Sequence, residues 1–253
     1  MKKQRVYLST IDPEAGSIAR AQGLGVEIAE YCTASNMDEH FEEHHQKVLA
    51  EVQGVPRRIL HGPFNELFPC AIDPMARRLA VQRYRQACGL AASYGADKVV
   101  IHAGFVPNVY YPCWYTEQSI LFWREFLKDM RENRIICLEN VMESDPAWMR
   151  DIVKEVDDPR LAICLDVGHA NVCSRIPVSG WLETLGPWIR HFHIHNNDSR
   201  ADTHSSLGQG NIPIEDVLRQ AQELDASFTL EVTNGALDVE WLRRRRHFRR
   251  HRR

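Results

Sequence analysis

Residues 191–198 read HFHIHNND, and this stretch decides which fold we expect. As a β-strand it would carry His191, His193 and His195 on one face, because side chains alternate along a strand. The end of that face would look out at the carboxyl end of a sheet, where His193 or His195 would bind a metal ion. His191 would pack deeper or be solvated. The stretch therefore predicts a strand that ends at a metal site.

Five other short apolar runs also end on residue types that bind metals. They finish at His61, His102, Glu139, Asp166 and Glu231. All strands of an eight-stranded parallel β/α barrel finish at the same face, where side chains from several strands converge. The pattern favours a polynuclear metal centre at a barrel mouth over scattered polar side chains.

Strand-like runs alternate with segments of helical periodicity along most of the chain. The expected strands are Val6–Ser9, Val26–Glu30, Arg58–His61, Lys98–His102, Ile135–Glu139, Ala162–Asp166, His191–His195 and Phe228–Glu231. The expected helices are Met37–Val52, Ala76–Tyr94, Gln118–Arg131, Asp145–Lys154, Gly180–Leu185 and Ile214–Leu224. This alternation predicts an α/β protein with a parallel sheet. Eight units predict a single (β/α)8 TIM-barrel domain over residues 1–242. No Gly-x-Gly-x-x-Gly fingerprint supports an open doubly wound sheet instead.

The C-terminal end departs from this pattern. Only Asp238–Arg246 remains for a last helix, so we expect the barrel to be incompletely sealed there. Residues 243–253 read RRRRHFRRHRR, with eight arginines and no acid. We expect a disordered tail, although basic blocks also bind nucleic acids or other anions. Without these eight charges the net charge of −3 becomes −11 (−3 − 8). Residues 1–242 are therefore strongly acidic, which makes them a poor electrostatic match to the phosphate backbone of a nucleic acid.

The composition fits a soluble, cytoplasmic protein. Of the 253 residues, 44% are apolar and 26% are charged, as in globular domains. No apolar stretch is long enough to span a membrane, and Met1–Arg5 leads into a strand-like run without a signal-peptide core. Seven cysteines without a Cys-x-x-Cys pair indicate reduced thiols. The oligomeric state stays open.

Three of the strand-end residues are acids, namely Glu139, Asp166 and Glu231. A carboxylate at the end of a buried strand must be paired or metal-bound, because burying a bare charge is costly. One cation shared by all three acids is a simpler explanation than three independent salt bridges. The imidazoles of His61 and His102, at equivalent strand ends, would be further ligands or else ordinary, partly buried side chains.

The loops contribute more candidates. His169 follows Asp166 by three residues, and Asp202 and His204 place a carboxylate and an imidazole two residues apart. The turn at Gly208 and Gly210 suits an anionic oxygen such as a phosphate, or is an ordinary loop. In the aromatic loop after His102, substrate would stack on Tyr111 and Trp114, unless these rings only cover the barrel.

Seven motifs together carry a family resemblance that covers the chain from Val6 to about Trp241. They are HGPF at 61–64, IHAG at 101–104, LEN at 138–140, LDVGH at 165–169, HIHNND at 193–198, DTHSSLGQGNI at 202–212 and LEVT at 230–233. The sequence resembles the xylose isomerase-like TIM-barrel superfamily. That superfamily includes sugar phosphate isomerases and epimerases as well as the endonuclease IV and AP endonuclease 2 type of abasic-site nuclease.

The resemblance implies a core metal held by Glu139, Asp166, a histidine of the 193/195 pair, and Glu231. In the epimerases, Glu139 and Glu231 would also move protons next to a carbonyl, with His169 or His195 orienting the substrate. In the nuclease branch, His61 and His102 would join Glu139 around a further zinc ion. The set His169, Asp202 and His204 would hold another.

We expect a metal-dependent sugar or sugar phosphate isomerase or epimerase, because HGPF and HIHNND resemble the isomerase-type members. The alternative is a multi-zinc phosphoesterase such as an abasic-site endonuclease, which the complete ligand set favours. A barrel that binds a ligand without converting it is a third hypothesis. The cofactor would be one to three divalent ions of zinc, manganese, cobalt or magnesium. The partner would be a small sugar or sugar phosphate, since the acidic body disfavours nucleic acid.

Overall fold

The computed structural model describes residues 5–130 and 133–245, which form a closed barrel of eight parallel strands in the order β1 to β8. The strands are β1 (Val6–Ser9), β2 (Gly25–Ile28), β3 (Arg58–His61), β4 (Lys98–His102), β5 (Ile135–Glu139), β6 (Leu161–Asp166), β7 (Ile189–Ile194) and β8 (Ser227–Leu230). The predicted (β/α)8 TIM barrel is confirmed. The expectation of incomplete sealing is wrong, because β8 pairs with β1, with Phe228 opposite Val6.

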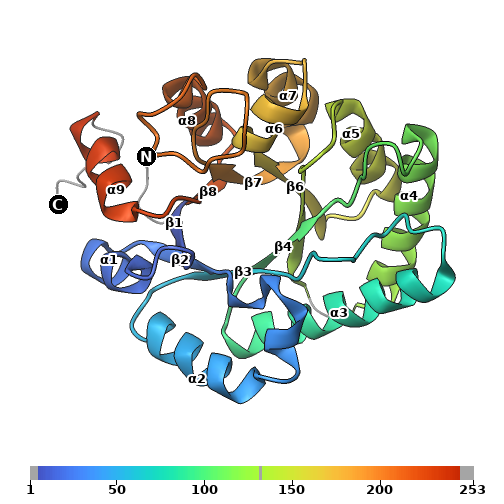
Figure 1. Ribbon diagram of the computed structural model, residues 1–253, viewed down its shortest axis with the longest axis horizontal. Helices are drawn as coiled ribbons and strands as arrows, with labels where there is room; N and C mark the ends of the chain where they lie inside the picture. Colours follow the sequence, from blue (N-terminus) through green and yellow to red (C-terminus); the bar gives the residue numbers. More distant parts are fainter. Residues whose placement is uncertain (1–4, 131–132, 246–253) are drawn as a thin grey trace.

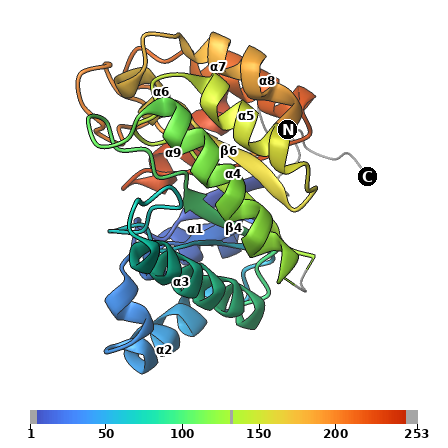
Figure 2. The ribbon, with the colours of Figure 1, turned by 90° about the vertical axis from the view of Figure 1, so that its right-hand side faces the viewer.

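Helices surround this barrel on all sides (Figure 1). They are α1 (Ala15–Gln22), α2 (Phe41–Val52), α3 (Pro74–Ser93), α4 (Pro112–Lys128), α5 (Pro146–Val156), α6 (Val167–Cys173), α7 (Val178–Leu185), α8 (Ile214–Glu223) and α9 (Gly235–Arg244), with short 3-10 turns η2 (Glu30–Cys32), η3 (Ala34–Met37) and η4 (Gly186–Trp188). The sequence did not predict α1 or α6. Neighbouring helices α4 and α5 pack side by side, as Figure 2 shows.

Two helices begin at an Asp-Pro pair. Asp73 Oδ1 accepts a hydrogen bond from Met75 N at 2.6 Å, and Asp145 Oδ1 accepts one from Ala147 N at 2.8 Å. The proline that follows each cap suits the first helical position, because its φ is preset and it lacks an N–H. In contrast, α4 begins six residues earlier than predicted. The predicted end of that helix at Arg131 lies outside the described residues.

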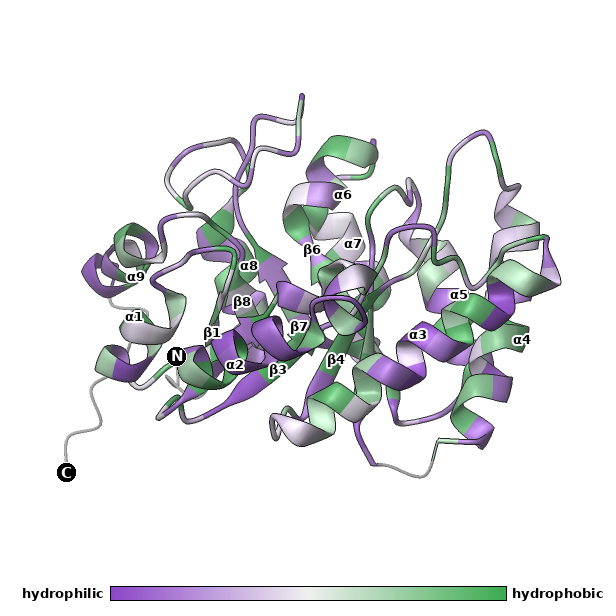
Figure 3. Cartoon of the chain, turned by 60° about the horizontal axis from the view of Figure 1, so that its bottom comes forward, coloured by the Kyte–Doolittle hydropathy of each residue, from purple (hydrophilic) through white to green (hydrophobic). Residues whose placement is uncertain are grey.

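Inward and outward positions alternate along the strands. Outward side chains join the helices in the main apolar core, and hydrophobic and hydrophilic segments alternate along α3 in Figure 3. A smaller cluster fills the inside of the barrel with Tyr7, Ile59, Val100, Cys137, Ala162 and Cys164. The next inward position after four of these residues is His61, His102, Glu139 or Asp166. The two-residue period of the strands therefore brings these side chains to one mouth.

Three further features concern the arginine-rich stretch, the lengths of the helices and the cysteines. Arg243 and Arg244, which open the arginine-rich stretch, belong to α9, whereas residues 246–253 lie outside the described residues. Among the described helices, none combines the length and apolar character needed to cross a bilayer. All seven cysteines carry free thiols in this structure.

Candidate metal centre

His193, on β7, lies at the centre of the cluster at the carboxyl mouth. Its Nδ1 is 3.1 Å from Glu139 Oε1, 3.2 Å from Glu231 Oε2 and 3.8 Å from Asp166 Oδ2. Asp166 is aligned with His193 across the β6–β7 pair, and Glu231 follows β8 directly. One ligand atom from each of these four side chains lies within 4.8 Å of the others.

The surroundings of His193 test whether this group fits a metal ion. Its Nε2 is 2.9 Å from Glu27 Oε1, and because a carboxylate can only accept, Nε2 carries the proton. In the neutral ring Nδ1 then turns a lone pair toward Glu139 and Glu231. Both Nδ1 and Glu231 Oε2 are buried without a hydrogen-bond partner, which requires a proton or a cation between them. A single imidazolium proton does not balance three carboxylates, whereas a divalent ion fits this donor set.

A second group forms around the other oxygen of Glu139. His61 Nε2 lies 3.1 Å and His102 Nε2 lies 3.5 Å from Glu139 Oε2. His61 Nδ1 donates to the Gly62 carbonyl at 2.9 Å, so Nε2 is the ring atom that faces Glu139. Burial lowers the pKa of His102 to about 4, which keeps this imidazole neutral, as a metal ligand must be.

A third group lies between α6 and the loop after β7. His169 Nε2 and His204 Nε2 are 3.1 Å and 3.0 Å from Asp202 Oδ2. His169 Nδ1 donates to the Asn140 carbonyl, and His204 Nδ1 donates to the Glu231 carbonyl, each at 2.9 Å. Such backbone anchors fix the tautomer and aim of metal-binding imidazoles. Three histidines of the mouth, His61 included, thus share one orientation.

His195 joins this third group rather than the core. Its Nε2 is 3.2 Å from both oxygens of Asp166 and 3.7 Å from Asp202 Oδ1, and its ring stacks on His204 with centroids 4.0 Å apart. A Cβ added at Gly168 would overlap with this ring, so only glycine allows the approach. The sequence left His193 and His195 as alternatives, and the geometry gives each a different group.

The carboxylates of the core are ionised. Burial alone raises the pKa of Glu139, but the charge of the His193 imidazole, together with hydrogen bonds from His169 and His193, outweighs burial and holds that pKa well below its usual range. Burial also raises the pKa of Asp166, but His169 and His195 outweigh this effect and lower that pKa to about 2. Adjacent ionised acids attract cations.

Glu27 was missed at the sequence level. The predicted strand ended at Glu30, but β2 ends at Ile28, and Glu30 accepts a hydrogen bond from the Thr10 hydroxyl at 2.7 Å. Glu27 is buried and faces both His193 and His191, whose Nε2 is 3.2 Å away. An acid inside the otherwise apolar strand GVEI was the available signal. His191 packs deeper, as predicted, with Nδ1 2.7 Å from Ser227 Oγ.

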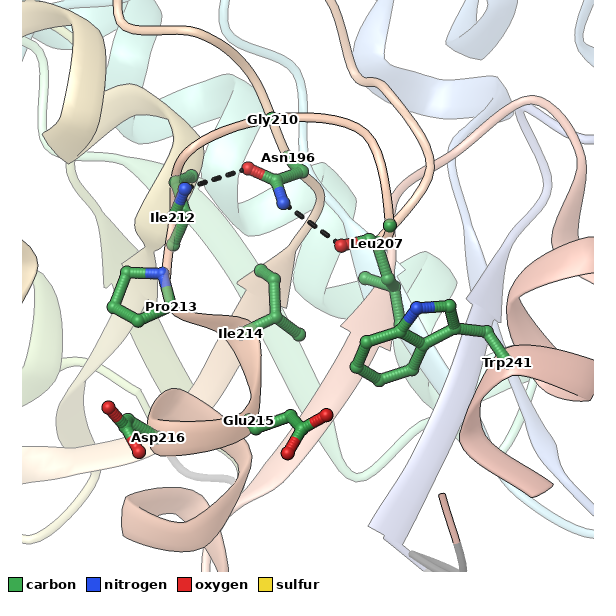
Figure 4. Close-up of a pocket in the computed structure, with 10 residues that line it drawn as sticks. Asn196, Leu207, Gly210, Ile212, Pro213, Ile214, Glu215, Asp216 and Trp241 are labelled. Carbon is green, nitrogen blue, oxygen red and sulfur yellow. Dashed lines mark hydrogen bonds between the residues drawn. The ribbon is translucent and has the colours of Figure 1, made fainter. Parts of the chain in front are cut away.

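The predicted substrate-binding glycines lie outside the three ligand groups. Gly208 and Gly210 line a pocket together with Asn196 and Trp241. Figure 4 shows Gly210 on the loop next to Asn196. A Cβ on Gly210 would overlap with Asn196 Oδ1, which itself accepts from Ile212 N at 3.1 Å, so packing explains the glycine. Two acids, Glu215 and Asp216, line the same pocket, and their charges do not favour an anion there.

The two predicted aromatic residues have different surroundings. Tyr111 is exposed and lines a cavity formed by the loops after β4 and β5. Trp114 is partly buried, and its Nε1 donates to the Cys70 carbonyl at 2.8 Å. Its indole N–H therefore fixes a neighbouring loop.

The curated relatives include two kinds of enzyme. A probable endonuclease 4 of Mycobacterium ulcerans is 27% identical over 173 residues, which cover 63% of this chain and 67% of that protein. Fructoselysine 3-epimerase of Escherichia coli O157:H7 is 34% identical over 166 residues, 58% of this chain and 56% of that protein. The first two curated relatives are matched over 64% and 71% of their length, so the first match reaches less than two thirds of that protein.

One solved structure is similar over nearly the whole chain. A Thermus thermophilus protein soaked with ZnCl2 is 27% identical, with a TM-score of 0.76 and coverage of 98% of this chain and 100% of that one. The family model described as a xylose isomerase-like TIM barrel matches residues 18–250. The chain therefore belongs to the xylose isomerase-like TIM-barrel family.

Proposed function

We propose that this chain is a metal-dependent phosphoesterase that holds up to three divalent ions at the barrel mouth. The observation that carries this proposal is the shared orientation of His61, His169 and His204. Each turns Nδ1 to a backbone carbonyl and Nε2 to a carboxylate. A single-ion isomerase core would need only Glu139, Asp166, His193 and Glu231. Of the anchored histidines, only His169 would then have a role, in orienting the substrate.

Bound divalent ions would lower the pKa of water and balance the charge that develops on the phosphoryl oxygens. Glu139 would hold the core and second groups together, because each of its oxygens faces a different one. Glu231, 12% exposed and with Oε2 unpartnered, would accept a proton from the attacking water. His169 would orient the ester through the third group. The acidic body favours a small phosphoester over duplex nucleic acid.

A second candidate is the isomerase or epimerase that the sequence favoured. Glu139 on β5 and Glu231 after β8 approach His193 Nδ1 from different strands, at 3.1 Å and 3.2 Å. Two carboxylates on either side of a bound ketose would remove a proton from one face and return it to the other. The 34% identical fructoselysine 3-epimerase supports this candidate.

Parallel assays on the metal-loaded full chain separate the two candidates. We expect hydrolysis of bis(p-nitrophenyl) phosphate with zinc, manganese or cobalt, and no exchange of C3 protons in ketohexoses or their phosphates. Glu139→Gln should abolish the hydrolysis. Proton exchange into a keto sugar without ester cleavage would overturn the phosphoesterase and favour the epimerase.

A further inference from the structure

A cavity of ≈ 960 Å³, which we name the aromatic groove, lies between the loops after β4 and β5 and the end of α6. None of the side chains that line it is a carboxylic acid or a basic group, and aromatic rings form much of its wall. The lining residues are Phe105, Pro107, Asn108, Val109, Tyr110, Tyr111, Pro112, Met142, Ser144, Trp148 and Cys173. Its volume lies in the range of small-molecule sites, roughly 300 to 1,000 Å³.

The groove belongs to the same strand ends as the metal ligands. Phe105 comes three residues after His102, and Met142 comes three residues after Glu139. Cys173 is the last residue of α6, the helix that carries His169. Burial raises the pKa of the Cys173 thiol, and the charges of His169 and Glu143 also act on it, which reflects how near the two regions are.

The inner wall of the groove is fixed by a buried acid. Glu143 Oε1 accepts hydrogen bonds from Phe105 N at 3.1 Å and from the Tyr115 hydroxyl at 3.0 Å, and Oε2 accepts from Val141 N at 2.7 Å. These bonds tie the loop after β4 to the loop after β5. The rings of Phe105 and Trp148 then pack with centroids 4.9 Å apart. The wall is therefore formed before any ligand arrives.

The outer rim leaves apolar surface in water. Val109 is 57%, Tyr111 79% and Met142 45% exposed. A contiguous exposed apolar patch beside polar groups is typical of a binding site. We propose that the aromatic groove binds an uncharged planar ring carried by the phosphoester substrate, adjacent to the ester group at the metal centre. The ester part of this inference rests on the proposed function, whereas ring binding does not require turnover.

The test measures the affinity of the metal-loaded full chain for phenylphosphonate and methylphosphonate by calorimetry. The two anions share the metal-binding group and differ only in the ring. We expect phenylphosphonate to bind at least about tenfold more tightly, which corresponds to about 1.4 kcal/mol. Met142→Asp and Tyr111→Asp, at exposed rim positions, should bring this ratio close to one. Leu121→Asp, 59% exposed on α4 and outside the groove, is the matched control and should leave the ratio unchanged.

Equal affinities, binding of neither anion, or a ring preference that survives both rim substitutions would overturn the inference. Because phosphonates are not hydrolysed, these results do not depend on catalysis. A ring preference without any cleavage of phosphodiesters would reject the proposed function and keep the groove. Cleavage of phosphodiesters without a ring preference would support the proposed function and reject ring binding in the groove.

Discussion

At the amino-terminal mouth of the barrel opposite charges are paired, whereas at the carboxyl-terminal mouth three carboxylates surround one imidazole. A charged pocket of ≈ 450 Å³ lies at the amino mouth. There Arg5 forms an ion pair with Asp225, and Lys98 Nζ is 3.7 Å from Asp97. These two ion pairs are neutral, and Arg57 and Arg190 line the same pocket.

The carboxyl mouth lacks such compensation. Among the described residues, the ion pairs of Glu139, Asp166 and Glu231 are formed with histidines and not with lysine or arginine. In β/α barrels the carboxyl face carries the chemistry and the amino face contributes stability. The comparison shows how one scaffold separates the two tasks. Substitutions at the carboxyl mouth should change metal binding and activity, and those at the amino mouth should change stability alone.

Glu139→Gln should have the largest effect, because this carboxylate faces two ligand groups at once. We expect the variant to lose at least two bound ions and activity to fall by about 10³-fold or more. Metal analysis and phosphodiester hydrolysis measure both quantities. Asp225→Asn, at the amino mouth and 77% exposed, should retain metal and activity. A Glu139→Gln protein with unchanged metal content would contradict the assignment.

Glu27→Gln should weaken the metal centre without removing a ligand. The amide is neutral, so it holds the His193 Nε2–H less strongly and lowers the basicity of Nδ1. Loss of such a partner typically costs about 10- to 100-fold in metal affinity. Competition with a chromogenic chelator measures the affinity, and circular dichroism checks that the barrel is intact. An unchanged affinity would show that Glu27 only fills the barrel.

Gly168→Ala should disturb the third ligand group, because the added Cβ overlaps with His195. Overpacking of this kind costs about 1 to 3 kcal/mol of unfolding free energy. Gly89→Ala, on α3 with no atom within 4 Å of the new Cβ, is the matched control and should raise stability by about 0.4 to 1 kcal/mol. Urea titration gives both values. Equal stability of the two variants would contradict the close approach.

Arg5→Ala should have the smallest effect and act only on stability. It removes the ion pair with Asp225, whose side chain is largely exposed. Exposed pairs contribute at most about 1 kcal/mol, and salt should reduce the difference further. Catalytic rate and metal content should equal those of the unmodified protein. A loss of activity would mean that the two mouths are coupled.

The fold and the convergence of most candidate ligands at one mouth could be predicted, because both follow from local periodicity. Parallel strands end at one face, and inward positions recur every second residue, so His61, His102, Glu139 and Asp166 could be assigned to one mouth from the sequence. Glu27 was missed although its place in the strand GVEI was a signal, because its partners His191 and His193 are 164 and 166 residues away. Only closure of the barrel brings them together.

Other errors have local causes. Helix α6 begins directly after Asp166, whose Oδ1 accepts from His169 N at 2.7 Å. No loop separates β6 from α6, so no turn residues in the sequence mark where this helix begins. In the sequence, the turn that contains Gly210 resembles an anion-binding turn. In the structure, close packing against Asn196 explains why a glycine stands there.

Metal stoichiometry of the full chain tests the central claim most directly. The protein would be stripped with chelator, reloaded with zinc, passed through a desalting column and analysed by plasma mass spectrometry against amino-acid analysis. The account predicts close to three ions per chain, falling to two in His204→Asn, which removes a ligand of the third group only. A single ion per chain, unchanged in His204→Asn, would contradict it and leave the one-metal isomerase as the better description.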